Sequence, residues 1–343
     1  MDILLSHATT YASPTTLLSF LFLPPLLLLS LYTLFPPRYL IRSLHIYPIK
    51  SCASIPVNSL QITSKGIQND RQYIVITRDK DDTKWEVVTQ RENPRLALIK
   101  PQLNEKNEVT ITFDEDSKIF PLKINHTSSN FQVELFRCFV TSSLIPNSDT
   151  YLKKHFPKKN YHIAYCHTGR DSTLDTKWFD CYSKNESAGA VDGSQVLLTF
   201  QRSLSALNSK LYRDDVGMSN FRPNIVFESS GIFNKIVEWE DDYLRTFKIL
   251  NLNFRVNKPC HRCILSTVLQ DEGRFDKSLE PLKTLRKVRY LRDSRFGERP
   301  GNSPGFGVNC SLVGEGGVLE VGMEGSGKWG IWRRSGWKNC AEN

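Results

Sequence analysis

The sequence predicts an α+β fold that is mainly β, behind a hydrophobic N-terminal segment. Three observations support this prediction. Stretches of alternating apolar and polar residues recur along the chain, apolar residues at helical spacing are confined to a few short stretches, and the first 37 residues are almost free of charge. The length of 343 residues allows two domains, and the hydrophobic content of 40% is ordinary for a globular protein.

Residues 1–38 are predicted to be a membrane anchor. From Ile3 to Pro37 there is no Lys, Arg, Asp or Glu, and the apolar core of this segment is about long enough to cross a bilayer as a transmembrane helix. Arg38 and Arg42 follow it, so the positive-inside rule puts the rest of the chain in the cytosol. A cleaved secretory signal is the alternative, but there is no basic n-region and the exit at 34–37 is a poor cleavage site.

Residues 39–150 are predicted to form a β-rich first domain, a small barrel or sandwich. Its alternating stretches predict strands at 40–47, 72–77, 85–89, 97–100, 109–113 and 132–136. Polar, turn-rich segments such as Arg78–Asp82 separate these strands. A helix is expected at 148–155, where a connecting segment, 151–185, begins.

Residues 186–323 are predicted to form a second domain that contains strands and helices. Apolar residues at helical spacing predict helices at 203–212 and 282–289. The expected strands are 224–227, 243–249 and 254–256. Residues 324–343 are rich in Gly and Trp and lack periodicity, which predicts an irregular C-terminal tail.

The net charge of +9 indicates an anionic partner, such as nucleic acid, an anionic membrane surface or a phosphorylated cofactor. The basic residues are scattered and no RNA- or DNA-binding motif is present, so nucleic acid is not the expected partner. The eight cysteines are sparse and irregularly spaced, unlike the disulfide framework of a short secreted chain. They are therefore predicted to be reduced thiols.

The segment Cys260-His261-Arg262-Cys263 lies between two strand-like stretches. Lys258 and Arg262 flank its thiols, and nearby cations favour thiolate, the form that binds soft metals. Three alternatives remain open. Half of a zinc site would need two more ligands, and no second such pair occurs at suitable spacing. A thioredoxin-type dithiol is expected to open a helix. The third alternative is a pair of buried packing cysteines.

Three basic turns accompany the cysteines. They are Tyr47–Cys52, Asn69–Arg71 and Asn220–Asn224, which offer guanidinium groups, a lysine, a hydroxyl and backbone amides. These groups suit an anion, and the planar fork of Arg suits phosphate in particular. Taken singly, each turn is more often a solvated surface turn. Together with the cysteines, they suggest a metal held by one protein sulfur and an anionic cofactor held by arginines.

In this order, the motifs resemble the MOSC-domain family and, within it, the branch of mitochondrial amidoxime reducing components. The matching segments are Ile46–Cys52, Asn69–Arg71, Asn220–Asn224, Lys258–Cys263, Glu280–Arg286 and Ser303–Gly307. The resemblance covers about residues 40–322, and six ordered motifs make it specific. It implies a MOSC N-terminal β-barrel domain followed by a MOSC β-barrel domain with flanking helices.

The resemblance also implies a molybdenum cofactor, a molybdopterin dithiolene with a terminal phosphate. Cys263 falls on the position that ligates molybdenum and is therefore the expected catalytic residue and metal ligand. The positions expected to contact the cofactor are Lys50, Ser51, Arg71, Asp192, Gly193, Ser194, Asn220, Arg222, Asn224 and Arg262. Two dithiolene sulfurs and one cysteinate form a soft set of donors that suits molybdenum.

The implied activity is reduction of N-hydroxylated compounds, namely amidoximes, hydroxylamines and N-oxides, with nitrite as a possible further substrate. Electrons would come from NADH through its reductase and a cytochrome b5-type donor. The implied location is the mitochondrial outer membrane, with the catalytic domain in the cytosol. The alternatives are a MOSC module that binds or relays sulfur or cofactor without turnover, and a redox dithiol protein using Cys260 and Cys263.

Three features depart from the family pattern. His261 replaces a residue that is often small, and Asn309 replaces a residue that is usually aromatic. After Gly322, the usual closing strand is expected to be absent.

Overall fold

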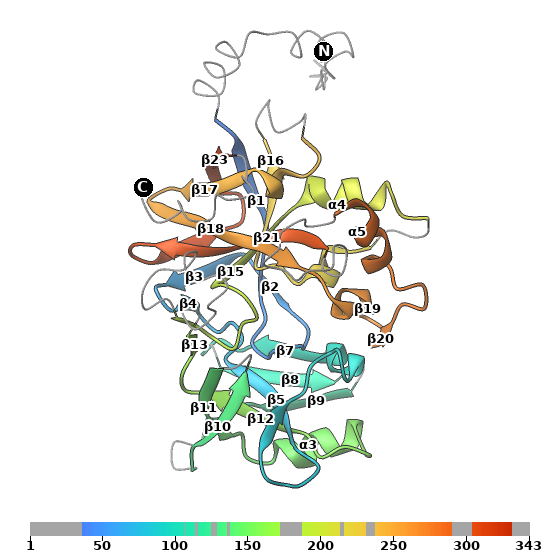
Figure 1. Cartoon of the computed structure of the whole chain (residues 1–343). Coiled ribbons are helices and arrows are strands. Elements are labelled where there is room, and N and C mark those ends of the chain that lie inside the picture. The colour runs from blue at the N-terminus through green and yellow to red at the C-terminus, as the bar shows by residue number, and fades with distance from the viewer. Residues whose placement is uncertain are drawn as a thin grey trace, which may run out of the picture.

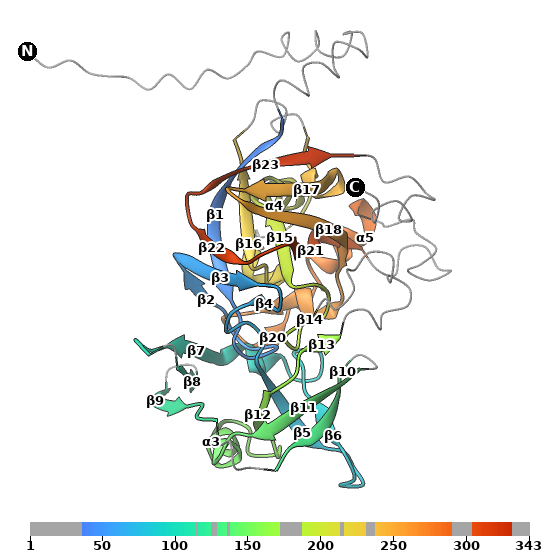
Figure 2. The ribbon, with the colours of Figure 1, turned by 90° about the vertical axis from the view of Figure 1, so that its left-hand side faces the viewer.

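The computed structural model describes residues 36–106, 108–113, 116–124, 129–135, 138–171, 187–212, 216–230, 237–289 and 304–330. Within these ranges the protein is mainly β with a few short helices, as the sequence predicts. Two groups of strands lie one above the other in Figure 1, and the view in Figure 2 separates them again. Connections between the two groups, together with turns within the larger group, hold the residues of the site described below.

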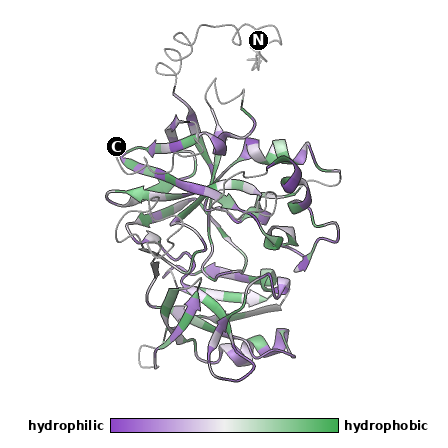
Figure 3. Cartoon of the chain, in the orientation of Figure 1, coloured by the Kyte–Doolittle hydropathy of each residue, from purple (hydrophilic) through white to green (hydrophobic). Residues whose placement is uncertain are grey.

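The larger group is a closed barrel. Its strands in order are β1 (Arg38–Ile46), β16 (Ile225–Ser229), β15 (Val196–Phe200), β21 (Gly305–Val313), β18 (Leu252–His261), β17 (Leu244–Ile249) and β23 (Glu324–Trp329), which returns to β1. β15 and β16 are parallel, and the other neighbours are antiparallel. Apolar segments follow these strands (Figure 3), and their inward side chains, such as Tyr39, Phe227 and Phe254, are almost fully buried.

The prediction that no closing strand follows Gly322 is wrong. β23 pairs with both β17 and β1 and closes the barrel, so the irregular tail does not begin at residue 324. A Cβ at Gly325 would lie 2.7 Å from the Lys248 carbonyl oxygen, and one at Gly327 would lie 2.7 Å from a ring carbon of Tyr39. These close approaches require glycine. Because glycine has low strand propensity, the residues of β23 do not show the alternating pattern that predicts a strand.

The strands that follow β1 pair with strands of the larger group or with strands close to it in sequence. β2 (Ile55–Val57) pairs with β1, and β3 (Ser59–Thr63) pairs with β4 (Gly66–Ile67) and with β22 (Gly317–Glu320). The chain then enters the smaller group and returns to the barrel at β15. Strand pairing therefore groups residues 38–67 with the second half of the chain, whereas the sequence-based division was drawn at residue 150.

The smaller group consists of two sheets and a helix. One sheet has the order β10 (Phe131–Leu135), β11 (Cys138–Leu144), β12 (His162–Cys166), β5 (Tyr73–Arg78) and β6 (Trp85–Val87). The other contains β7 (Ile99–Leu103), β8 (Val109–Phe113) and β9 (Asp116–Pro121), with α3 (Ser148–His155) as predicted. The strand expected at 97–100 begins only at Ile99, because Pro94–Leu98 forms the 3-10 helix η1 with a proline in its first turn.

Short elements complete the described fold. They are the pairs β13 (Arg170–Asp171) with β14 (Ser187–Ala188) and β19 (Val268–Leu269) with β20 (Arg274–Phe275), the helices α4 (Gln201–Asn208) and α5 (Leu282–Val288), and the 3-10 helices η4 (Met218–Phe221), η6 (Glu240–Asp242) and η7 (Ile264–Thr267). The two predicted helices of the second half are thus confirmed, each shorter than expected. Of the predicted membrane anchor, 1–38, residues 1–35 lie outside the described ranges, and Arg38 is the first residue of β1 and not part of an anchor. Within those ranges, no helix is long and apolar enough to cross a membrane.

Candidate functional site

A cavity of about 340 Å³ lies where the turn after β1, the start of β5, the loop before β15, the segment after η4 and the end of β18 meet. It is lined by all eleven residues that the family resemblance indicated. They are Lys50, Ser51, Arg71, Asp192, Gly193, Ser194, Asn220, Arg222, Asn224, Arg262 and Cys263. Residues far apart in the sequence are therefore gathered in one place. What each of them binds remains a prediction.

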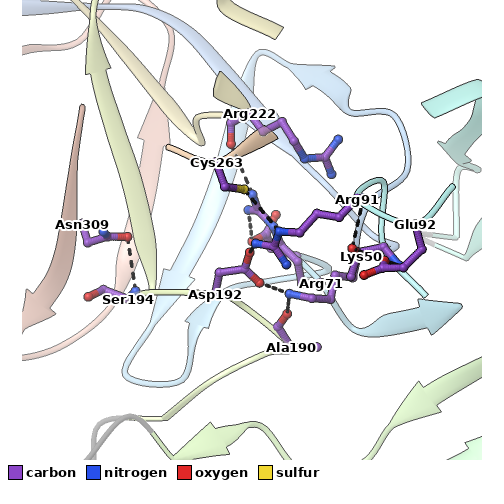
Figure 4. Close-up of polar contacts among 12 residues, drawn as sticks. Lys50, Arg71, Arg91, Glu92, Ala190, Asp192, Ser194, Arg222, Cys263 and Asn309 are labelled. Carbon is purple, nitrogen blue, oxygen red and sulfur yellow. Dashed lines mark hydrogen bonds and ion pairs between the residues drawn. The ribbon is translucent and has the colours of Figure 1, made fainter. Parts of the chain in front are cut away.

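The turn after β1 contributes Lys50 and Ser51. The Lys50 Nζ donates to the Ala190 carbonyl oxygen at 2.9 Å and forms an ion pair with Asp192 (Figure 4). The Lys50 side chain is buried, which lowers its pKa, although Asp192 opposes this effect. Ser51 has a φ of 65°, a left-handed conformation that is uncommon for a residue other than glycine.

Arg71 and Arg222 share one aromatic ring. Their guanidinium carbons lie 4.3 Å and 4.4 Å from the centroid of Tyr47, and both residues have left-handed backbone, with φ of 48° and 55°. Arg71 Nη2 donates to the Arg222 carbonyl oxygen at 3.2 Å, and Arg222 Nη1 donates to the Cys52 carbonyl oxygen at 2.6 Å. Burial lowers the pKa of Arg222, and the neighbouring Arg71 lowers it further. Strained, buried cations of this kind are typical of a binding site.

The two predicted asparagines support the cavity wall. Asn224 Oδ1 accepts from the Leu197 amide and from Arg71 Nη1, both at 3.1 Å, and its Nδ2 donates to Asp70 Oδ1 at 3.1 Å. Asn220 Nδ2 donates to the Ser266 carbonyl oxygen at 3.0 Å. Asn220 thereby ties the turn before Arg222 to η7, which begins directly after Cys263.

Arg262 and Cys263 follow β18, whose pairing with β21 is irregular at two places near the cavity. Arg262 donates to the carbonyl oxygens of Phe221 and Phe306, each at 2.9 Å. Among the six cysteines in the described ranges, Cys263 is the exposed one, and all six are free thiols. Burial raises the pKa of Cys52 to about 12 and that of Cys166 to about 11, so those thiols remain protonated.

The loop before β15 contributes Asp192, Gly193 and Ser194. The Asp192 side chain is 49% exposed and lies between Lys50 and Arg91. Burial alone would raise the pKa of Asp192, but Lys50 outweighs this effect and the pKa is lowered. A Cβ at Gly193 would lie 2.2 Å from Asn309 Oδ1, so Asn309 packs where only glycine leaves room. Asn309 Oδ1 also accepts from the Ser194 amide at 3.5 Å (Figure 4).

Sequence reasoning missed Arg91. Its Nε donates to Cys263 Sγ at 3.2 Å, across 172 positions of the chain (Figure 4). Arg91 lies in a polar turn between β6 and η1 that resembles any exposed turn, so no local pattern marks it. Lys258 also lines the cavity, together with Cys260 and His261.

The lining is strongly cationic. It contains six basic side chains, those of Lys50, Arg71, Arg91, Arg222, Lys258 and Arg262, against the single carboxylate of Asp192. Asp70, behind the lining, pairs with Arg71, and the excess of positive charge that remains favours an anionic ligand. Within the described ranges, no three His, Cys, Asp or Glu side chains gather where they could hold a metal ion.

Comparison with known proteins identifies the family. Residues 39–148 match the MOSC N-terminal beta barrel domain, and residues 185–324 match the MOSC domain. The chain belongs to the MOSC-domain family. The sequence prediction of the family is thereby confirmed.

The curated relatives of this MOSC protein include amidoxime reducing components and a molybdenum cofactor sulfurase. It is 29% identical to mitochondrial amidoxime reducing component 2 of Macaca fascicularis over 82% of this chain and 81% of that protein, and 28% identical to mitochondrial amidoxime-reducing component 1 of Homo sapiens over the same shares. It is 26% identical to molybdenum cofactor sulfurase of Arabidopsis thaliana over 75% of this chain and 32% of that protein. The solved YuaD protein of Bacillus subtilis matches with a TM-score of 0.38 and 8% identity, too distant to inform the site.

Proposed function

We propose that this MOSC protein is a molybdenum-cofactor-dependent oxidoreductase that reduces N-hydroxylated compounds, namely amidoximes, hydroxylamines and N-oxides, and also nitrite. The relatives support a function related to the molybdenum cofactor. One observation supports the site more than any other. A cationic cavity of about 340 Å³ has one exposed thiol, Cys263, among the described cysteines.

The residues present fit the proposed cofactor. Lys50, Arg71, Arg222 and Arg262 would neutralise its anionic parts, with Ser51, Asn220 and the loop 192–194 beside them. Asn224 would act by holding Arg71, because its Oδ1 accepts from that guanidinium. Cys263 would supply the single protein sulfur, and the dithiolene would complete a soft donor set around molybdenum. When bound, the cofactor would supply the two-electron redox chemistry, while the protein orients it and limits access.

The proposed reaction cleaves an N–O bond. For a hydroxylamine, the substrate R–NH–OH takes up two electrons and two protons and gives R–NH2 and water. We propose that the electrons come from NADH through its reductase and a cytochrome b5-type protein. The mitochondrial names of the relatives support a mitochondrial location, and we propose the outer membrane, with residues 1–37 as the anchor and the catalytic part in the cytosol.

The first test is the molybdenum and pterin content of the full chain, beside Cys263→Ala and the matched variant Cys260→Ala. We expect molybdenum stoichiometric with the chain in the wild type and in Cys260→Ala, and loss of both metal and activity with benzamidoxime in Cys263→Ala. Cys260 is a suitable control because it lines the same cavity but is less exposed than Cys263. Full activity of Cys263→Ala, or a wild type without molybdenum in cofactor-replete cells, would refute the proposal.

A second candidate function is favoured by the match to molybdenum cofactor sulfurase. As a sulfur or cofactor relay, the chain would bind the cofactor but would not turn over benzamidoxime with the cytochrome b5-type donor present. The same preparations therefore separate the two functions. Equal loss of activity in Cys260→Ala and Cys263→Ala, with a reversible disulfide, would instead indicate a redox dithiol.

A further inference from the structure

Arg91 differs from the other cations of the cavity in its position. Its side chain is 33% exposed, and its Nε donates to the sulfur of Cys263, which is itself exposed. Its Nη2 lies 3.6 Å from Asp192 Oδ2. In Figure 4 the guanidinium lies between the Cys263 sulfur and the Asp192 carboxylate. Arg91 therefore stands at the solvent-accessible rim of the cavity, beside the sulfur.

The deeper arginines have their guanidinium groups fixed by main-chain acceptors. Arg71, Arg222 and Arg262 each donate to at least one backbone carbonyl oxygen. Arg71 also contacts the side chains of Asp70 and Asn224. In the part of the chain that the structure describes, the polar contacts of the Arg91 guanidinium are with side chains alone, those of Cys263 and Asp192. Side-chain partners can be exchanged for a ligand without moving the backbone. This makes Arg91 the cation of the lining best able to meet an incoming small molecule.

The backbone of Arg91 is nevertheless held firmly. Its amide donates to Thr89 Oγ1 at 3.2 Å, and Gln90, which is fully buried, exchanges two amide hydrogen bonds of 3.1 Å with Gln270. Gln270 follows η7 and β19, the elements that come directly after Cys263. The Gln90–Gln270 pair therefore fastens the Arg91 turn to the segment that holds Cys263.

We infer that Arg91 is a specificity-determining residue, which favours substrates that present an anionic or lone-pair-bearing oxygen to the open side of Cys263 and disfavours cations. This inference rests on the proposed reductase function. A guanidinium donates to such oxygens and repels ammonium and amidinium groups. Neutral amidoximes and nitrite satisfy the requirement. Amidines, the products of amidoxime reduction, are stronger bases that become cations, so the same charge assists their release.

The test uses two alkylating agents on the full chain, produced in cells that make no molybdopterin. Iodoacetate is anionic and iodoacetamide is neutral, and both attack the thiolate, so the ratio of their rates at Cys263 does not depend on how far the thiol is ionised. The rates are followed by mass spectrometry of the Cys263 peptide. In the wild type we expect a high ratio of the iodoacetate rate to the iodoacetamide rate. In Arg91→Gln we expect this ratio to be about fivefold lower, because one nearby charge is lost. High salt should also weaken the preference.

Two variants control this measurement. Arg91→Lys keeps the charge and should retain most of the preference. Arg274→Gln makes the same chemical change at a half-exposed arginine that does not line the cavity, and should leave the ratio unchanged. The same ratio in the wild type and in Arg91→Gln would overturn the inference. Because the measurement needs no cofactor, it remains decisive even if the chain proves not to bind molybdenum.

Kinetics of the cofactor-loaded enzyme then test the specificity directly. We expect Arg91→Gln to lower kcat/KM for nitrite and to raise it for an N-hydroxylated substrate with a fixed positive charge, while a neutral substrate changes least. An equal loss on all three substrates would show that Arg91 supports the site in general, and would contradict a role in selection.

Discussion

At the inner wall of the cavity, Arg71, Arg222 and Arg262 donate to backbone carbonyl oxygens, whereas at the rim the described contacts of the Arg91 guanidinium are with the side chains of Cys263 and Asp192. Arg222 is buried and the Arg71 side chain is 12% exposed, whereas the Arg91 and Asp192 side chains are 33% and 49% exposed and Cys263 is exposed. The inner wall is therefore fixed by the fold, while the rim can respond to a ligand.

This difference suits the inner wall and the rim to different ligands. Buried guanidinium groups with fixed directions suit retention of a permanent anionic cofactor, since a bound anion would compensate more of their desolvation. A half-exposed cation beside an exposed thiol suits transient contact with substrate.

The largest effect is expected at Arg222. In Arg222→Met, we expect the cofactor content of the purified chain to fall by about tenfold to a hundredfold, as is usual when a group supporting a metal site is removed. The melting temperature of the cofactor-free variant should be unchanged or higher, because burial lowers the pKa of Arg222 and its charge is costly to bury. Pterin analysis and thermal unfolding measure the two quantities.

Arg42→Met is the matched control, because Arg42 is a half-exposed arginine of β1 that pairs with Glu228 away from the cavity. It should leave the cofactor content unchanged. If Arg222→Met kept its cofactor, or if the cofactor-free variant failed to fold, Arg222 would be a structural residue and the division between wall and rim would not hold.

A smaller effect is expected at the Gln90–Gln270 pair, which links the rim to the segment after Cys263. Gln90→Leu should lower the free energy of unfolding by about 1 kcal/mol, because Gln270 loses its partner but is itself partly exposed. It should also reduce the preference of Cys263 for iodoacetate, since Arg91 would no longer be held. Urea unfolding and the alkylation ratio measure these effects.

The double variant Gln90→Leu, Gln270→Leu completes the cycle. Replacing both partners by apolar groups is less costly than removing one, so part of the stability should return. The alkylation ratio should stay low, because the link is still absent. A double variant with the normal ratio would mean that the pair does not position Arg91.

The mainly β fold and the family could be predicted from the sequence for different reasons. Strands such as β5 and β8 alternate clearly, and the ordered motifs identified the family. The glycine-rich β23 was missed because close packing against Tyr39 and Lys248, and not strand propensity, determines it.

The rim could not be derived in the same way. Arg91 meets Cys263 across 172 positions of the chain and Gln90 meets Gln270 across 180, and neither local spacing nor charge pattern encodes such contacts. The left-handed backbone of Ser51, Arg71 and Arg222 could likewise not be predicted from the sequence, since none of these residue types favours a positive φ. Such exceptions to local rules are expected where a site is built.

The smallest effect concerns Asp192 at the rim. Its folded-state pKa is lowered, because Lys50 outweighs the opposing effect of burial. The carboxylate therefore contributes stability above its ordinary pKa of 3.8, and this contribution is lost as the pH falls through the lower folded value. On acidification from about pH 6 to about pH 3, the cofactor-free wild type should lose more stability than Asp192→Asn, by less than about 1 kcal/mol because the side chain is 49% exposed.

Glu228→Gln serves as the control for this measurement, because Glu228 has a similar exposure of 48% and pairs with Arg42 outside the cavity. It shows how much of the effect arises from losing any half-exposed ion pair of this chain. Urea unfolding at each pH gives the comparison. If Asp192→Asn showed the same acid-induced loss as the wild type, the ion pair with Lys50 would contribute nothing in solution. The Lys50 ion pair would then not hold the Asp192 carboxylate in place, and a ligand could displace that contact at little cost.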